Sequence, residues 1–170
     1  MAASGGTNDS ARALESVWDY PLPPVVERCE AHAQVILNGF VIADSYSTIR
    51  VLQTGLAPSY YFPPDDVEPS YLRPNGRHAR CAYRGRASYY DVVVGDREVI
   101  DGAWTYHDPN PGFADLADRV AFHAARMDMC LLDGEPVRGD PEDPTGGWIS
   151  AGVLGLSRGY PPFWDRSEDT

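Results

Sequence analysis

The sequence predicts a mainly β protein, built as one compact antiparallel, barrel-like domain with one or two short helices. Three segments each show an apolar run, a two-residue turn and a second apolar run, which is the pattern of a β-hairpin. The chain has 170 residues, of which 43% are hydrophobic, and this suits one buried core. Because so many strands must share that core, we expect a closed or nearly closed arrangement.

The two ends differ in composition from the middle of the chain. Residues 1–15 are small and polar, which predicts a disordered N-terminus. Residues 159–170 are rich in Pro, Asp and Ser and predict a flexible acidic tail. We therefore place a single domain at 16–158. It begins with WDYPLPP at 18–24, whose prolines predict an extended arm lying on the domain.

The three hairpins share turn residues that tolerate positive φ. They are predicted at residues 33–45 around Asn38–Gly39, 89–102 around Gly95–Asp96, and 129–137 around Asp133–Gly134. In the first two hairpins, the second strand is also followed by an acidic residue and then a small one. This similarity leaves two interpretations open, a weak internal repeat or the general likeness of β-hairpins.

One helix is predicted at 112–121, GFADLADRVA. Its apolar residues Phe113, Leu116, Ala117 and Val120 fall on one helical face.

Charge and composition exclude several function classes. The formal net charge is −11, which opposes binding to phosphate backbones, so we expect no nucleic-acid partner. All 14 basic residues are arginine, which excludes Schiff-base chemistry and a P-loop lysine.

Cysteine usage and hydropathy indicate the cellular setting. Cys29, Cys81 and Cys130 are odd in number and far apart, so they suggest neither a zinc knuckle nor a disulfide framework. We expect no bound metal, no cofactor and a reducing cytoplasm. The first residues contain no apolar signal region and no later run approaches 18 apolar residues, so we expect neither secretion nor a membrane partner.

Six segments carry a resemblance when they are taken in order and spacing. They are WDYPLPP, VIADSYSTIRVLQTGLAPSYYFPPDDV, CAYRGRASYYDV, GAWTYHDPNP, RVAFHAARMD and GGWISAGVLG. Together they resemble the family called domain of unknown function 427, over about residues 17–158. The resemblance implies a β-tent-like fold similar to that of small zinc-binding domains but without the metal. The family is sometimes labelled nucleotidyltransferase-like. That label implies a Gly-Ser turn followed by spaced metal-binding carboxylates, which this sequence lacks.

The resemblance also supplies site candidates. Positions typical of the family stand unchanged at Arg50, Tyr60, Tyr61, Pro63, Asp66, Cys81, Gly85, Ala87, Tyr89, Trp104, Tyr106 and Pro109. At six other positions this sequence departs from the residue usual in the family, and these changes alter a polar site. The family usually has Glu where this chain has Gln53, His for Arg80, Pro for Ala82, Lys for Arg84, Pro for His107 and an aromatic residue for His123.

The segment SYYFPPDD places phenols and carboxylates at a strand end. Tyr60, Tyr61 and Asp66 would supply a hydrogen-bond donor and a base. The alternative is a packed aromatic residue followed by a turn. Because adjacent strand residues face opposite ways, only one of the two tyrosines should enter a given pocket.

The segment CAYRGRASYY gathers a thiol, tyrosines and arginines. Arg84 and Arg86 would clamp an anion unless they are merely solvated, and Gly85 would allow a bulge that re-aims its neighbours. Cys81 is either a nucleophile, with its pKa lowered by nearby arginines, or a small buried hydrophobe.

Further along, Trp104 and Tyr106 share a strand face and would form one wall of an aromatic pocket, with core packing as the alternative. His107 and His123 add imidazoles suited to proton transfer near neutral pH, although a lone histidine is more often structural. We expect His107 at the rim and His123 near the core.

Three functional hypotheses follow. The first is an enzyme of the cyclase, isomerase or lyase type, which uses acid–base chemistry on a small organic molecule. Its expected catalytic residues are Tyr61, Asp66, Tyr89 and His107, and its ligand-binding residues are Arg50, Tyr60, Cys81, Arg84, Trp104, Tyr106 and His123. The second is a module that binds a small ligand in an aromatic cage without turnover. The third is an interaction or stability domain that has no pocket.

Overall fold

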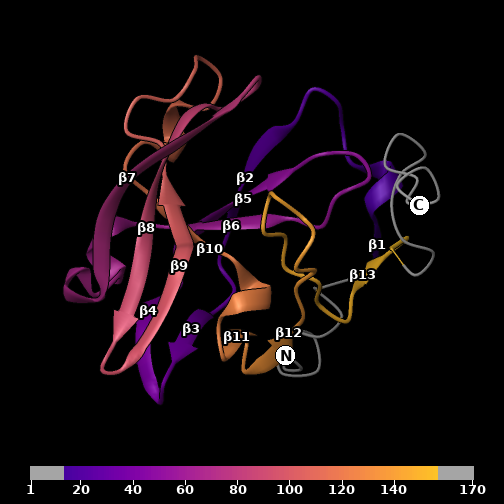
Figure 1. Ribbon diagram of the computed structural model, residues 1–170. Helices are drawn as coiled ribbons and strands as arrows, with labels where there is room; N and C mark the ends of the chain where they lie inside the picture. Colours follow the sequence, from indigo (N-terminus) through magenta and orange to yellow (C-terminus); the bar gives the residue numbers. More distant parts are fainter. Residues whose placement is uncertain (1–13, 157–170) are drawn as a thin grey trace, which may run out of the picture.

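The computed structural model describes residues 14–156, and this part of the chain is mainly β (Figure 1). Its helical structure consists of 3-10 turns of three residues each. These are η1 (Val17–Asp19), η2 (Pro64–Asp66), η3 (Pro69–Tyr71), η4 (Ala114–Leu116) and η5 (Ala124–Arg126). No helix among these described residues is long and apolar enough to cross a membrane.

The largest sheet has seven strands, and every neighbouring pair in it is antiparallel. In spatial order the strands are β2 (Val25–Cys29), β5 (Thr48–Leu52), β6 (Ser59–Phe62), β10 (Val120–Phe122), β9 (Arg97–Thr105), β8 (Gly85–Val94) and β7 (Leu72–Cys81). The predicted mainly β, antiparallel class is confirmed, and strands β2 and β7 are the edges of this sheet, so it is open and not fully closed. The core is completed by a second sheet instead.

That second sheet has four antiparallel strands and lies below the first in Figure 1. Its order is β12 (Glu135–Val137), β11 (Met129–Leu132), β3 (Ala33–Leu37) and β4 (Phe40–Ser45). A short parallel pair, β1 (Glu15–Ser16) with β13 (Val153–Leu154), joins the two ends of the described chain.

All three predicted hairpins are confirmed: β3–β4, β8–β9 and β11–β12. Asn38 and Gly39 have φ values of 54° and 82°, the left-handed region that the Asn-Gly pair was expected to adopt. The Asn38 amide donates a 2.9 Å hydrogen bond to the Val94 carbonyl. The first hairpin turn therefore contacts the second, although the two hairpins lie in different sheets.

The helix predicted at 112–121 is wrong. The segment forms η4, a turn at Asp118 with φ 63°, and then β10. Val120 pairs with Thr105 on one side and Phe62 on the other, so two strand ladders compete with the local helical pattern and win. Such long-range pairing outweighs a single helical turn of apolar spacing.

The first described residues are more ordered than the sequence predicted. Glu15, at the end of the segment predicted to be disordered, lies in β1. Residues 1–13 and the tail predicted at 159–170 lie outside the described residues. The extended arm begins with the turn η1, and no strand follows until Val25. Tyr20, between them, is buried against the domain.

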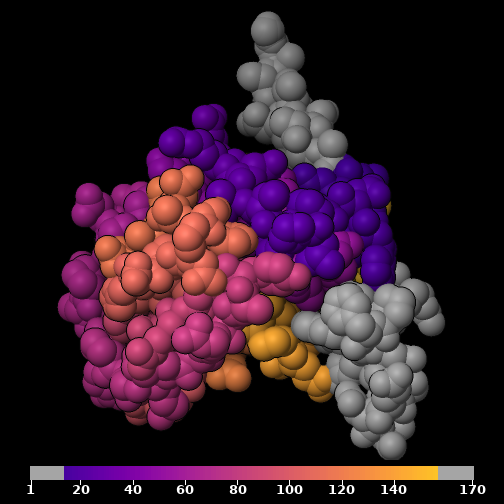
Figure 2. Space-filling model, turned by 90° about the horizontal axis from the view of Figure 1, so that it is seen from above, coloured from indigo at the N-terminus to yellow at the C-terminus, as the bar shows by residue number. Residues whose placement is uncertain are grey.

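Two apolar clusters occupy the opposite faces of the seven-stranded sheet. The larger, which includes Val35, Phe62, Phe122 and Trp148, fills the space against the four-stranded sheet. The other includes Tyr61, Trp104, Tyr106, Phe113 and Leu116. The loop that connects β9 to β10 (residues 106–119) supplies the last two and covers one end of the molecule (Figure 2).

Candidate functional site

Four predicted site residues, Tyr61, Tyr89, Trp104 and Tyr106, contact one another, and we call them the aromatic cluster. Tyr61 and Tyr106 have ring centroids 6.2 Å apart, and those of Tyr89 and Trp104 are 6.3 Å apart. The indole Nε1 of Trp104 donates to the Tyr61 hydroxyl at 3.4 Å. The prediction that Trp104 and Tyr106 share a face is confirmed, since both pack in the same buried cluster.

Strand register explains how these rings meet. Tyr61 on β6 pairs with Ala121 on β10, Ala121 pairs with Trp104 on β9, and Trp104 pairs with Tyr89 on β8. Directly opposed residues on one sheet face lie about 4.5–5.5 Å apart at Cβ. The small side chain of Ala121 leaves room for the two large rings beside it.

One end of the aromatic cluster carries a buried cation. Arg84 is 5% exposed, and its Nη1 lies 3.3 Å from the Cys81 sulfur. Its Nε has no hydrogen-bond partner in the part of the chain that the structure describes. Burial, followed by the charge of Tyr61, raises the pKa of Tyr106, so that its phenol stays protonated near neutral pH.

The other end of the aromatic cluster opens into a cavity of about 400 Å³, which we call the His123 cavity. Trp104 and Tyr89 line it together with His123. The His123 ring meets the Trp104 ring edge-on, with centroids 6.3 Å apart and planes at 75°. The aromatic cluster therefore connects a buried guanidinium to a buried imidazole.

The electrostatics of the His123 cavity suit proton transfer. His123 is 6% exposed, and its Nδ1 has no hydrogen-bond partner among the described residues. Burial, and then the charge of Arg126, lower the pKa of His123, so the ring is neutral at pH 7 and can accept a proton. Burial and the nearby Asp101 raise the pKa of Tyr89, which keeps its phenol available as a donor.

The far wall of the cavity is the segment 141–144. Gly146 lies so close to Trp104 that an added Cβ would stand 2.4 Å from its Cη2. The Asp143 carboxylate accepts hydrogen bonds from the Thr145 amide at 2.8 Å and the Gly147 amide at 3.1 Å. These contacts hold the wall against the sheet.

Sequence reasoning did not identify several residues of this cavity. Arg77, His78, Asp101, Arg126 and Asp143 line it, yet they come from four separate segments with no motif in common. The glycines at 139, 146 and 147 were the available signal, because glycine marks close approach of two backbones. At Gly139, an added Cβ would stand 2.3 Å from the Ala125 nitrogen.

Four predicted site residues lie apart from the aromatic cluster. Arg50 and Tyr60 line another cavity, of about 570 Å³. Tyr60 faces the larger core and stacks near Trp148, opposite Tyr61, as alternation requires. Asp66 lies in η2 on a different surface, and exposed His107 pairs with Asp118 at 2.8 Å.

Arg50 is neutralised within its own cavity. Its guanidinium nitrogens bind Glu15 at 2.8 Å and Glu27 at 2.6 Å. In the same way, Arg84 and Arg86 do not form a joint clamp, since Arg84 is buried and Arg86 exposed. Gly85 is also not a bulge: it closes the β7–β8 turn with φ 113°, and the register shifts fall after Pro74 and Tyr90.

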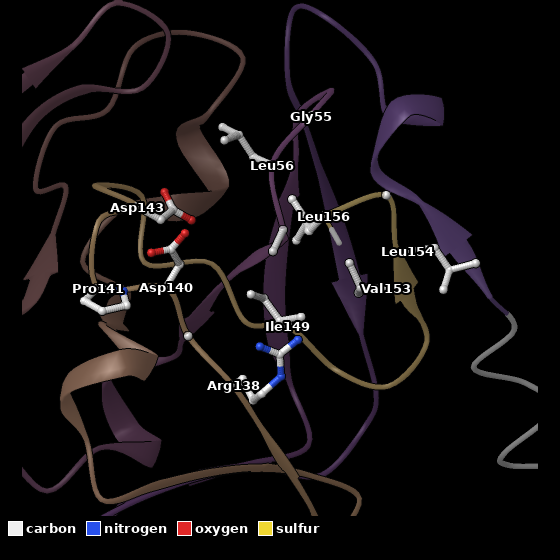
Figure 3. A pocket seen from close by; sticks show the side chains of 13 residues that line it. Gly55, Leu56, Arg138, Asp140, Pro141, Asp143, Ile149, Val153, Leu154 and Leu156 are labelled. Carbon is white, nitrogen blue, oxygen red and sulfur yellow. The ribbon is translucent and has the colours of Figure 1, made fainter. Parts of the chain in front are cut away.

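A third cavity, of about 540 Å³, lies on the other side of the segment 140–143. Figure 3 shows Asp140 and Asp143 on one side of it and Val153 and Leu156 on the other. Asp143 lines both this cavity and the His123 cavity. Within residues 14–156, no three His, Cys, Asp or Glu side chains are grouped to hold a metal ion.

Comparison with protein families matches residues 25–133, more than half of the chain, to the model NTP_transf_9, described as Domain of unknown function (DUF427). No curated protein matches the chain. The matched region contains the whole aromatic cluster, Arg84 and His123. It ends before the segment 141–144, which forms the far wall of the His123 cavity.

Proposed function

The chain belongs to the domain of unknown function 427 family, and from this premise we propose that it is an enzyme that performs acid–base chemistry on a small organic molecule in the His123 cavity. One observation carries the proposal. A buried neutral imidazole with an unpartnered ring nitrogen and a protonated phenol line the same cavity of about 400 Å³, with the Trp104 ring in contact with both. Perturbed titratable groups in a concave site are typical of catalytic centres.

The proposed roles follow from these protonation states. His123 accepts a proton from the substrate, and Tyr89 donates one to the developing product. Trp104 forms the flat wall against which an unsaturated or ring-shaped substrate packs. Such proton transfer suits an isomerase, cyclase or lyase and accelerates reactions by about 10²–10⁴-fold.

Two arginines, Arg77 and Arg126, and three acidic residues, Asp101, Glu142 and Asp143, line the cavity, and an anionic substrate group would bind at an arginine. Arg126 donates to the Ile100 carbonyl at 3.2 Å and also lines the cavity, so it remains able to bind a carboxylate. Arg77 is less available because it pairs with Asp101 at 2.9 Å. A small organic acid is therefore the preferred substrate class.

The alternative is a binding module without turnover, and one observation favours it. Tyr89, Trp104 and His123 already form an aromatic surface on the cavity, and such a surface can hold a ligand with no proton transfer.

One experiment separates the two functions. Small organic acids that raise the melting temperature are incubated with the protein in D₂O, and the recovered compounds are analysed by mass spectrometry. Acid–base chemistry predicts deuterium incorporation or a new isomer, whereas a binding module returns the compound unchanged.

Variants then test the roles. His123→Phe, which introduces the aromatic type usual in the family, should reduce turnover at least about 100-fold while keeping the fold. His107→Phe is the matched control, since His107 is exposed and lies outside the cavity. If His123→Phe turns over substrate as fast as the unmodified protein, His123 is not the base.

A further inference from the structure

Cys81 and Arg84 flank the turn between β7 and β8, and the turn folds the arginine back onto the thiol. The Arg84 backbone nitrogen and its Nη1 both donate to the Cys81 sulfur at 3.3 Å. Cys81 is half-buried, whereas Arg84 is almost fully buried. One residue therefore directs two N–H donors, one from its backbone and one from its side chain, at the same sulfur atom.

The buried guanidinium has no carboxylate to balance it in the described part of the chain. The groups that act on Arg84 are Tyr61, Cys81 and Tyr106, all uncharged in their ordinary forms near pH 7. Taking an unpaired charge out of water costs several kcal/mol, by the order of magnitude known for buried ions. A negative charge on the Cys81 sulfur would offset that penalty.

The turn is held in place by the neighbouring loop. The Asn110 side chain donates to the Tyr83 carbonyl at 3.0 Å, and the Asn110 amide donates to the Arg84 carbonyl at 2.9 Å. Gly85, at φ 113°, lies so close that an added Cβ would be 3.3 Å from Asn110. The arrangement of guanidinium and thiol is thus fixed before any reactant arrives.

The other two cysteines provide a contrast. Cys130 is buried in the larger core, and burial raises its pKa. At Cys81, burial also raises the pKa of the thiol, but the N–H groups and charge of Arg84 lower it by more, so its pKa falls below the ordinary value. Cys29 is half-buried on β2, far along the sheet from β7.

We propose that Cys81 is a nucleophilic thiolate held by Arg84, and that it reacts with small hydroperoxides to form a sulfenic acid. The sulfur attacks one peroxide oxygen, the S–O bond forms as the O–O bond breaks, and the sulfur loses two electrons to the peroxide. With hydrogen peroxide, the thiolate becomes the sulfenic acid, and the other peroxide oxygen leaves as hydroxide, which an acid of the buffer protonates to water.

The first test uses the unmodified protein, with its other cysteines as internal controls. It is treated with hydrogen peroxide and dimedone, and the labelled peptides are quantified by mass spectrometry. Cys81 should be labelled at least tenfold faster than Cys29, with Cys130 unlabelled until urea is added. Equal labelling of Cys81 and Cys29 in the folded protein overturns the proposal.

A pH series separates a thiolate from simple exposure. Iodoacetamide alkylation of Cys81 should keep its plateau rate at pH values below the ordinary thiol pKa of about 8.5, and lose that advantage in urea. The groups that influence this titration are Arg84, Tyr61 and Tyr106, with Arg80 and Arg86 exposed on the paired strands. The same pH profile in folded and unfolded protein would contradict the assignment.

Arg84→Met tests the cation and Arg86→Met is its control, because Arg86 is exposed on the same hairpin. Arg84→Met should slow labelling of Cys81 at least tenfold, whereas Arg86→Met should change it less than twofold. Equal rates in the two variants contradict the proposal. If Arg84→Met does not fold, the pH series on the unmodified protein decides alone.

His123→Phe should leave the reactivity of Cys81 unchanged, so this proposal and the proposed acid–base function fail independently.

Discussion

At the scale of single residues, His123 links the candidate site to stability. Because its pKa is lowered by burial, the unfolded chain binds a proton at this position where the folded protein does not. The free energy of unfolding should therefore rise with pH between the folded pKa of His123 and the ordinary value of about 6.5.

The variant His123→Phe should remove this part of the acid sensitivity. We expect urea unfolding of the variant to vary less with pH below about 6.5 than that of the unmodified protein. Exposed His107, replaced in the same way, provides the comparison. An unchanged pH dependence in His123→Phe would show that folding does not lower the pKa of His123.

Replacing Arg84 should affect the stability of the fold and the reactivity of Cys81 in different ways. Its guanidinium is buried with an unpartnered Nε, and a buried charge without a good partner is less favourable than an apolar group of similar size. Where the Cys81 thiol is protonated, Arg84→Met should therefore unfold at an equal or higher urea concentration; at higher pH the lost pairing with the Cys81 thiolate opposes this gain, and the labelling of Cys81 slows. A loss of more than about 3 kcal/mol, the effect of breaking a buried ion pair, would mean that Arg84 has a strong partner.

The members of the site were not equally predictable. Tyr61, Tyr89 and Trp104 could be predicted because strand alternation and family resemblance both indicate them. Asp101 and Arg126 could not be predicted, because only strand pairing and the turn that follows β10 bring them to the same cavity. His123 was identified only as an unusual residue at an aromatic position, with no sign of the cavity beside it.

At the scale of elements, the sequence was informative where structure depends on neighbouring residues. A hairpin turn such as Asn38–Gly39 acts within a few residues, and all three hairpins were predicted. The segment 112–121 was mispredicted because β10 exists only through its pairing with β6 and β9. Whether the large sheet is closed or open could not be decided from the sequence for the same reason, since strand order depends on contacts distant in sequence.

The wall segment gives a prediction at this scale. Gly146→Ala should destabilise the fold, because the new Cβ would lie 2.4 Å from Trp104 Cη2 at a backbone φ of 65°. We expect a loss of about 1–3 kcal/mol from overpacking, in addition to about 1–2 kcal/mol from the left-handed backbone. Urea unfolding followed by tryptophan fluorescence measures the total.

Gly134→Ala is the matched control for the backbone term. Gly134 has φ 83° in the β11–β12 turn, and an added Cβ would meet nothing within 4 Å. Gly134→Ala should therefore lose only the stability that the left-handed backbone costs, without the overpacking contribution. Equal losses in the two variants would show that the wall moves away from Trp104 without difficulty.

At the scale of the whole molecule, the two ends of the described chain are joined to each other and to the sheet. Strand β1 pairs in parallel with β13, and Arg50 on β5 binds Glu15 on β1 through Nη1 at 3.0 Å and Nη2 at 2.8 Å. The Tyr20 hydroxyl donates to the same carboxylate at 2.6 Å. Arg50 thus fastens the first strand of the described chain to the large sheet.

Glu15→Gln tests this attachment. Hydrogen bonds from Arg50 lower the pKa of Glu15 against the effect of burial, with a further contribution from Tyr20. A carboxyl group whose pKa is lowered on folding stabilises the fold at pH values above its unfolded pKa of about 4.3. This stabilisation is lost as the pH falls through the folded pKa. The variant should therefore lose stability at pH 7 and match the unmodified protein in strong acid. Because the Glu15 side chain is 36% exposed, solvent screening limits the loss to about 1 kcal/mol.

The loss should be local as well as small. Hydrogen exchange at the Glu15 amide, which donates to the Gly152 carbonyl at 2.8 Å, should accelerate in Glu15→Gln at pH 7. Glu27→Gln is the control, since Glu27 binds the same arginine only through Nε and is 48% exposed. It should leave that amide protected. If both variants exchange equally, β1 is held by its pairing with β13, and the charge of Arg50 serves the cavity that it lines.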